Sequence, residues 1–399
     1  MAAGCGRVLT TIRVMRTSVL VVGVVLTAAL MFAMCQAMIV PRRSSSRIVW
    51  AVNGTVAAVA RMPLRWFRTY KAQDRWLSGS APISVLLQLI VYVVLLIVTM
   101  GLVIFGTTGL SLNDSIYQSG ASLTTLGIVE PVNEASGVAI FLAAFLGLVV
   151  VAIFIGYLMA LNGAYVTRES GLARAAILAG EPAWGPLFLI RGRQLGLPRN
   201  ELPDPSLWLD WMSTTRLNHE VNPVLMEFRS MSSRRHWVTT ALAALDAAAL
   251  QVSITEDALP HQLQLLTEGT ITMWALADDL RTSPRAATAA TAASRSPVGH
   301  NWDVERIVLD VVHGIDTGPP GECGVPRAQF DQVLQLLGEQ VTLAPDEAWR
   351  RFQTIRSLYY QAAADLACRL HAVPAPWSGP RDPDLPVEYP LLPEGTWLK

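Results

Sequence analysis

Charge is what this sequence has least of for its length. Of its 399 residues only 16% are charged and 52% are hydrophobic, and charged side chains are absent from residues 17–40, 76–113 and 135–167. A bilayer core about 30 Å thick needs roughly 20 apolar helical residues to cross it, and each uncharged interval contains such a stretch. The sequence therefore predicts an all-α membrane protein with three transmembrane helices rather than an ordinary soluble protein.

Lysine and cysteine are also rare, and the net charge is zero. These features argue against particular classes of partner and site. Only Lys71 and Lys399 are lysines, and the 31 basic residues equal the 31 acidic ones. A nucleic-acid partner, which would require a basic face, is therefore not expected. The four cysteines form no C-x-x-C pair and lack the spacing of a disulfide framework or a zinc site.

Motifs of catalysis are missing as well. The histidines have no i, i+4 pair, and neither an H-E-x-x-H motif nor a glycine-rich phosphate loop occurs. No nucleophile elbow or constellation of paired carboxylates is present. We therefore expect no enzyme activity, no metal site and no cofactor.

Composition divides the chain into consecutive segments. The N-terminal part comprises a short segment (1–16), a first transmembrane helix (17–40), a basic cytoplasmic or interfacial segment (41–80) and a domain of two membrane helices (81–168). The remainder comprises a cytoplasmic helical region (169–281), a flexible low-complexity linker (282–299), a C-terminal helical region (300–373) and a proline-rich tail (374–399).

The first apolar run admits two interpretations. Ser18 to Val40 is longer than the 7–15 apolar residues usual in a signal peptide, and it ends at the basic flank Pro41-Arg42-Arg43. An uncleaved membrane helix is the favoured interpretation, and a cleaved signal peptide is the alternative.

The distribution of basic residues predicts the orientation in the membrane. Residues 41–80 carry seven arginines and one lysine against the single acid Asp74, whereas residues 109–135 carry no basic residue. By the positive-inside rule the former segment is cytoplasmic and the latter external. This places the N-terminus outside, against the three arginines of residues 1–16, and the C-terminus in the cytoplasm. The stretch Ile48–Phe67, with tryptophans among arginines, is either an interfacial segment or a plain cytoplasmic linker.

Helical periodicity continues through the C-terminal part. We expect an alanine-rich helix over His236–Ile254, for which a fourth membrane span is the alternative, although Asp246 in its middle opposes insertion. Further helices are expected at Leu259–Leu280, Asp303–His313, Arg327–Gly338 and Asp346–His371.

The region between the second and third apolar helices has an unusual pattern. A full helix (Pro82–Phe105) is followed by glycines, a short helix (Asn113–Leu123), an extended Thr/Gly stretch and a second full helix (Gly137–Leu161). Ser111 and Asp114 can form a variant of the capping box at the start of the short helix. Non-helical backbone at membrane depth is tolerated only where protein buries it or where it lines a watery path, so the pattern predicts a re-entrant loop.

The residues that follow the short helix carry the chemistry of an ion path. The C-terminal end of a helix bears partial negative charge, which favours a cation. Thr124, Thr125, Leu126 and Gly127 then offer hydroxyl and carbonyl oxygens that can replace the hydration shell of an ion. Glu130 is expected at the outer mouth of such a path as part of an acidic ring.

These residues resemble a known family. Residues 117–131, Y-Q-S-G-A-S-L-T-T-L-G-I-V-E-P, resemble the pore helix and filter of the potassium-channel superfamily, whose signature is T-x-T-T-V-G-Y-G-D followed closely by proline. By this resemblance, which covers roughly residues 80–168, Thr124 and Thr125 match the filter threonines. Leu126 matches the valine, Gly127 the first glycine, Ile128 the aromatic position and Glu130 the aspartate. The resemblance implies a permeating monovalent cation, potassium in that family, and a homotetramer in which four loops surround one path.

One residue departs from the family pattern. Val129 occupies the position of the second glycine, whose backbone conformation is costly for a β-branched residue. We therefore expect Ile128 and Val129 to be extended and the selectivity for potassium to be weak, with a collapsed pore as the alternative.

Other interpretations of the same segment stay open at this point. Residues 124–130 can form a plain extracellular hairpin, and Gly147 and Gly156 either act as hinges or let helices approach closely. The rivals of a channel are a non-conducting membrane-anchored sensor or scaffold and a subunit of a larger transporter. Beyond the lipid bilayer, the sequence indicates no specific cytoplasmic partner or ligand.

Overall fold

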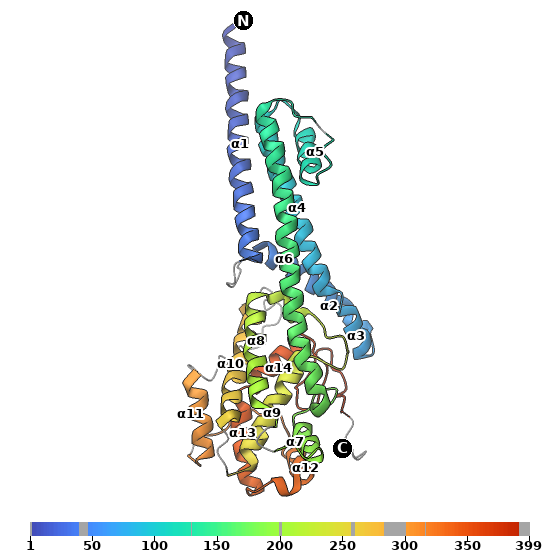
Figure 1. Cartoon of the computed structure of the whole chain (residues 1–399), viewed down its shortest axis with the longest axis vertical. Coiled ribbons are helices and arrows are strands. Elements are labelled where there is room, and N and C mark those ends of the chain that lie inside the picture. The colour runs from blue at the N-terminus through green and yellow to red at the C-terminus, as the bar shows by residue number, and fades with distance from the viewer. Residues whose placement is uncertain are drawn as a thin grey trace. The chain divides into compact units, whose positions relative to one another are not determined.

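A computed structural model describes residues 2–39, 47–128, 130–198, 202–256, 260–282, 301–315 and 317–390. Helices form all the regular structure of these residues, and no strand occurs among them (Figure 1). The all-α fold class expected from the sequence is confirmed. The chain forms two compact units, residues 1–53 with 82–162 (unit 1) and residues 54–81 with 163–399 (unit 2).

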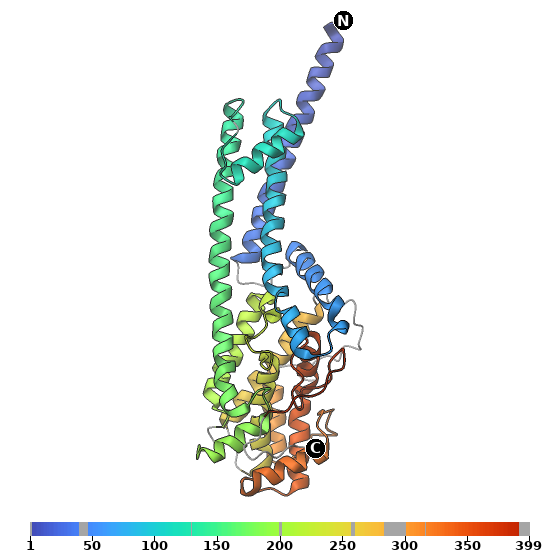
Figure 2. The same ribbon diagram turned by 90° about the vertical axis from the view of Figure 1, so that its right-hand side faces the viewer.

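Unit 1 consists of long apolar helices and one short helix. It contains α1 (Ala2–Met38), most of α4 (Ser80–Thr107), α5 (Leu112–Leu123) and the first part of α6 (Glu134–Ala179). Figures 1 and 2 both show α5 beside α4, at the end where the chain turns back toward α6. Tyr92, Leu96, Ile104 and Ala143 form the centre of the core of this unit.

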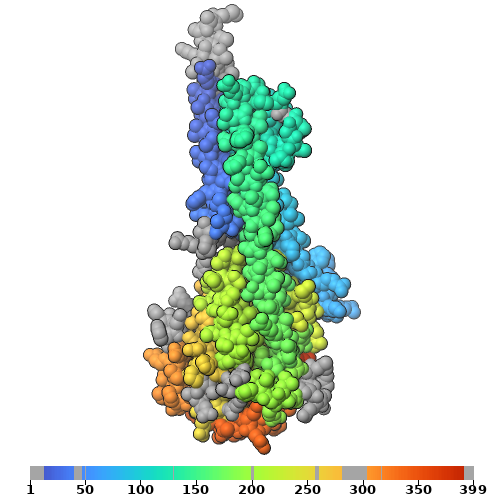
Figure 3. Space-filling model, in the orientation of Figure 1, coloured from blue at the N-terminus to red at the C-terminus, as the bar shows by residue number. Residues whose placement is uncertain are grey.

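The outward surface of unit 1 is apolar. Figure 3 shows α6 uncovered along much of its length, and its side chains Phe141 and Leu148 are 73% and 59% exposed. Large apolar side chains that find no protein cover are typical of helices that face lipid or other subunits. The unit therefore has the surface of a membrane protein.

Four stretches of the described chain are long and apolar enough to cross a membrane: Arg13–Met38, Tyr70–Thr107, Glu134–Ala179 and Trp237–Ile254. The last of them is α9 (Trp237–Ile254), and it differs from the others because every one of its residues is buried by protein. In its middle, Asp246 accepts hydrogen bonds from the guanidinium of Arg356 at 2.8 and 3.1 Å and from the hydroxyl of Tyr359 at 2.9 Å. α9 is therefore the central core helix of unit 2.

The other helices of unit 2 surround α9. They are α7 (Gly185–Gln194), α8 (Pro205–Val221), α10 (Pro260–Thr282), α11 (Asn301–Val312), α12 (Arg327–Leu337), α13 (Pro345–Ser357) and α14 (Tyr360–Arg369), and α7, α10, α13 and α14 contact α9 directly. Short 3-10 turns lie at Met62–Trp66, Pro223–Glu227 and Gly338–Gln340. The segment that precedes α4 forms α2 (Arg47–Arg61) and α3 (Tyr70–Leu77), and residues 54–81 belong to this unit.

The predicted helices are found near their expected positions, with two corrections. The helix expected over Gly137–Leu161 continues as α6 to Ala179, past residue 168 where the membrane domain was expected to end, because no proline interrupts the chain before Pro182. The single helix expected over Asp346–His371 is two helices, α13 and α14, separated at Leu358 and Tyr359. The carbonyl of Leu358 accepts a hydrogen bond from the indole Nε1 of Trp274 at 2.7 Å, and Tyr359 has a φ of −120°, which is not helical. A distant tryptophan thus interrupts an otherwise continuous helical pattern. The linker expected at 282–299 lies almost wholly outside the described residues.

Candidate ion-pathway segment

α5 begins with the cap that the sequence indicates. The hydroxyl of Ser111 accepts a hydrogen bond from the backbone N–H of Asp114 at 3.2 Å and donates one to the Asp114 carboxylate at 2.7 Å. The predicted variant of the capping box is confirmed. It fixes where the short helix starts, and the Asp114 carboxylate lies in its first turn, where the helix dipole favours negative charge.

Glycines let α5 lie close against its neighbours. A Cβ on Gly147 of α6 would lie 2.2 Å from the carbonyl oxygen of Leu123, the last residue of α5, and a Cβ on Gly101 of α4 would lie 2.9 Å from the side chain of Ile116. The hydroxyl of Ser119 also donates to the Ile97 carbonyl of α4 at 2.9 Å. Close packing is therefore the observed role of Gly147. A Cβ on Gly156, by contrast, would meet nothing within 4 Å.

The C-terminal end of α5 differs from the expected extended stretch. Thr124 caps the helix, with its backbone N–H and hydroxyl both donating to the Gly120 carbonyl at 3.0 and 2.7 Å. Thr125 N–H donates to Ser122 O at 3.0 Å and Leu126 N–H to Ala121 O at 2.8 Å, which is the bonding of a Schellman motif. Thr125, at the position that glycine normally takes in this motif, has a φ of 60°. The two threonines therefore end the helix instead of starting an extended segment.

Leu126, Gly127, Ile128 and Glu130, which follow the two threonines, are exposed. Gly127 also has a positive φ, 61°, and the side chains of Leu126 and Ile128 are 66% and 61% exposed. Glu130 is exposed, whereas Val129 lies outside the described residues, and so does its predicted conformation. The structure thus brings Thr124 to Ile128 together in one exposed turn at the end of α5.

Gln118 is a residue of this region that the sequence analysis did not single out. Its side chain is fully buried, its Nε2 donates to the Glu130 carbonyl at 3.2 Å, and its Oε1 has no partner among the described residues. This bond ties the end of the exposed turn back to α5. The sequence feature that could have indicated Gln118 is a polar side chain on the face that a short amphipathic helix buries.

No family model, curated protein or solved structure matches the chain. Any functional assignment therefore depends on the geometry of the molecule and on the motif in its sequence. The described residues contain no group of three or more His, Cys, Asp or Glu side chains that could hold a metal ion. Thr124 to Ile128 and Glu130, the described residues of the predicted ion path, contribute only hydroxyl, carbonyl and carboxylate oxygens as possible cation ligands.

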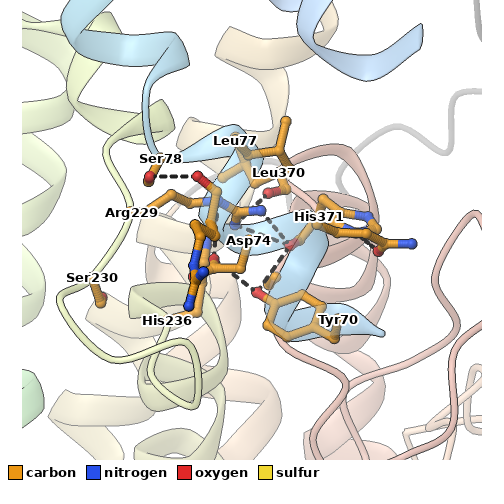
Figure 4. Close-up of polar contacts among 12 residues, drawn as sticks. Tyr70, Asp74, Leu77, Ser78, Arg229, Ser230, His236, Leu370 and His371 are labelled. Atoms are coloured by element: carbon orange, nitrogen blue, oxygen red, sulfur yellow. Dashed lines mark hydrogen bonds and ion pairs between the residues drawn. The ribbon is translucent and has the colours of Figure 1, made fainter. Parts of the chain in front are cut away.

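A second polar cluster lies in unit 2, and it was not foreseen either. Figure 4 shows Arg229 between Asp74 of α3 and the backbone that follows α14. Its Nε lies 3.3 Å from the Asp74 carboxylate, and its Nη1 and Nη2 each donate to the His371 carbonyl at 3.0 Å. Tyr70 lies within the same cluster and donates to that carbonyl at 3.3 Å.

Burial sets the ionisation of this cluster. Burial raises the pKa of Asp74, and the neighbouring Arg229 opposes that change. Burial, followed by the nearby Arg229 and Arg381, lowers the pKa of His371 to about 3. His371 is thus neutral at physiological pH, and its Nε2 pairs with Gln73 Oε1 at 2.6 Å. Partners between 142 and 301 positions apart in the sequence leave no local pattern by which such a cluster could be predicted.

Proposed function

We propose that the protein is a monovalent cation channel resembling the two-helix potassium-channel pore. In this proposal α1, α4 and α6 cross the membrane, α5 is the pore helix of a re-entrant loop, and α9 remains in the soluble domain. The observation that carries the proposal is the turn at Thr125–Gly127, which adopts a costly backbone conformation at the end of a capped helix held between two apolar helices.

The cost of that turn is the reason to assign it a function. A left-handed conformation costs roughly 1–2 kcal/mol for a residue with a Cβ, and a β-branched residue such as Thr125 is a clear outlier there. Such strain persists where the surrounding structure enforces it, and it concentrates at functional sites. Here the Schellman bonds of α5 and the close contact at Gly147 hold the turn in place.

The chemistry of the turn suits a cation. The C-terminal end of α5 contributes partial negative charge, and Thr124 to Gly127 present hydroxyl and carbonyl oxygens. A single chain supplies one such turn, so a ring of oxygens around an ion requires several copies, and fourfold cyclic symmetry provides it. The proposed assembly is a homotetramer that conducts potassium, with weak selectivity because Val129 replaces the second filter glycine.

The proposal includes a location. The protein is a multi-pass protein of the cell membrane, with its N-terminus outside and its C-terminal domain in the cytoplasm. The basic segment before α4 and the absence of basic residues at 109–135 support this orientation.

Ion flux through the purified full-length protein in liposomes tests the proposal. Potassium and sodium uptake are measured for the wild type and for Gly127→Ala, which places a Cβ at a φ of 61°. We expect the wild type to conduct and Gly127→Ala to lose about tenfold or more of the flux because the turn is strained. Gly163→Ala is the matched control, since a Cβ at Gly163, a helical glycine of α6, would meet nothing within 4 Å.

Two results would contradict the channel. A robust flux that Gly127→Ala leaves unchanged would show that residues 124–130 do not line the path. No flux from a well-folded wild type, or a stable monomer by mass measurement in detergent, would favour the non-conducting sensor or scaffold.

A further inference from the structure

α3, which directly precedes α4, has two faces with different roles. Tyr70, Gln73, Asp74 and Leu77 are buried, and Figure 4 shows Tyr70 and Asp74 directed into the cluster around Arg229. Gln73 adds to this attachment, since its Nε2 donates to the carbonyls of Leu64 and Phe67 at 3.1 Å each. These contacts fix the rotation of α3, so its opposite face is held in a defined orientation.

That opposite face contains a hollow lined by cations and aromatic rings. The hollow has a volume of about 440 Å³ and is lined by Phe67, Thr69, Lys71, Ala72, Arg75 and Trp76. The rings of Phe67 and Trp76 lie 6.1 Å apart, and the indole Nε1 of Trp76 donates to the Ala60 carbonyl at 2.8 Å. The aromatic wall is therefore fixed by a hydrogen bond to α2.

The positive charge around the hollow is not neutralised by any acidic side chain in the described parts of the chain. Arg65, Arg68, Lys71 and Arg75 are exposed and have no ion-pair partner in the described parts of the chain. The only acid of this stretch, Asp74, points the other way, where Arg229 is its partner. The surface thus offers several free cations to an external anion.

We propose that this hollow binds the phosphate of an anionic phospholipid headgroup. Lys71 and Arg75 contact the phosphate, while the rings of Phe67 and Trp76 lie at the level of the headgroups, where amphipathic aromatic side chains are favoured. Trp66 and Met62, which are 84% and 73% exposed, supply further apolar contact with the membrane surface. The uncharged apolar run of α4 starts within a few residues of Trp76, which suits a site at the membrane edge.

The proposal rests on the membrane location included in the proposed function and is independent of ion conduction. A lipid bound here would hold α3, and with it the start of α4, at the membrane surface. Each lysine or arginine near a negatively charged lipid surface strengthens the binding of that lipid about fivefold. Two such residues together therefore account for roughly a 30-fold difference in lipid affinity.

Lipid binding to the full-length protein in detergent tests the site. Delipidated protein is titrated with phosphatidylglycerol, with phosphatidylcholine of the same acyl chains or with inorganic phosphate, and bound lipid is counted by native mass spectrometry. We expect phosphatidylglycerol to bind at least tenfold more tightly than phosphatidylcholine, and inorganic phosphate not to compete at millimolar concentration. The double variant Lys71→Gln/Arg75→Gln should weaken phosphatidylglycerol binding roughly 30-fold.

The matched control removes two exposed arginines elsewhere in unit 2, Arg174→Gln/Arg306→Gln, and should bind phosphatidylglycerol as the wild type does. Circular dichroism and monodispersity check that each variant is folded. Equal binding of the two lipids, equal losses in both double variants, or full competition by inorganic phosphate would each overturn the lipid site. None of these results depends on whether the protein conducts ions.

Discussion

At the scale of single residues, buried arginines organise the loops of unit 2. Each of Arg168, Arg229, Arg356 and Arg381 donates to backbone carbonyls in loops, including those of Phe228, His371, Trp377 and Ala372. A guanidinium is suited to this role because it carries five N–H donors in a fixed plane. Removing one of these arginines would leave buried carbonyls without hydrogen-bond partners. This would lower the stability of the fold, because these carbonyls gave up their hydrogen bonds to water when the chain folded.

The pH dependence of stability should report on one histidine of this network. The pKa of His371 falls from 6.5 to about 3, mainly through burial and secondarily through Arg229, Arg381 and Arg61. Below pH 6.5 His371 therefore binds a proton in the unfolded chain but not in the folded protein. The free energy of unfolding consequently decreases as the pH falls from 6.5 toward 3. At pH 5 this loss amounts to about 2 kcal/mol. His371→Gln, which cannot titrate, should remove that part of the loss when urea unfolding is compared at pH 7 and pH 5.

The readout is the change in stability between the two pH values, because the substitution also alters stability by itself. The raised pKa of Asp74 acts in the opposite direction, which is a further reason to compare variants rather than total slopes. His313→Gln, at an exposed position, is the control and should keep the pH dependence of the wild type. An unchanged slope in His371→Gln would refute the assignment.

At the scale of elements, local patterns predicted where helices lie but not how they end. The cap at Ser111 and the apolar stretches within α4 and α6 were predictable, because both depend on neighbours within a few residues. The left-handed turn at Thr125 was not, since a threonine stands where the usual signal is a glycine. The break at Leu358 was also hidden, because its cause is Trp274, 84 positions earlier.

The close packing of α5 against α6 leads to a prediction for Gly147. Gly147→Ala should lower the thermal stability of unit 1 by about 1–3 kcal/mol, because its Cβ would lie 2.2 Å from the Leu123 carbonyl and must displace the end of α5. Gly156→Ala, in the same helix and with nothing within 4 Å, should be neutral or stabilising by up to about 1 kcal/mol. Thermal inactivation in detergent measures both. Equal stability of the two variants would mean that α5 does not pack against Gly147.

At the scale of the whole molecule, the boundaries drawn from composition differ from the division into compact units. The sequence suggested a cut near residue 80, between a basic segment and a membrane domain. In the structure residues 54–81 belong with residues 163–399. The reason is a set of contacts such as that of Gln73 with His371, 298 positions apart, which no periodicity can reveal.

The orientation of the chain in the membrane can be tested directly. A cysteine introduced at Val132, which is 58% exposed, should react with a membrane-impermeant maleimide added to intact cells, because that loop is proposed to lie outside. A reporter enzyme fused after Arg174 should be active only if that part is cytoplasmic, and we expect it to be. Labelling only after lysis together with an external reporter would reverse the topology and remove the pore loop from its proposed place.

The position of Asp246 has a consequence for the way the chain is made. α9 has enough apolar length to be taken for a membrane span, with a mean hydropathy of 1.4, yet its place is inside a protein core. Its ion-pair partner Arg356 lies 110 residues further along, so it is not yet synthesised when α9 leaves the ribosome. An unpaired aspartate at the centre of a helix costs about 2.5–3.5 kcal/mol on insertion by the translocon. We therefore expect the carboxylate that later anchors the core to disfavour insertion of the nascent segment into the bilayer.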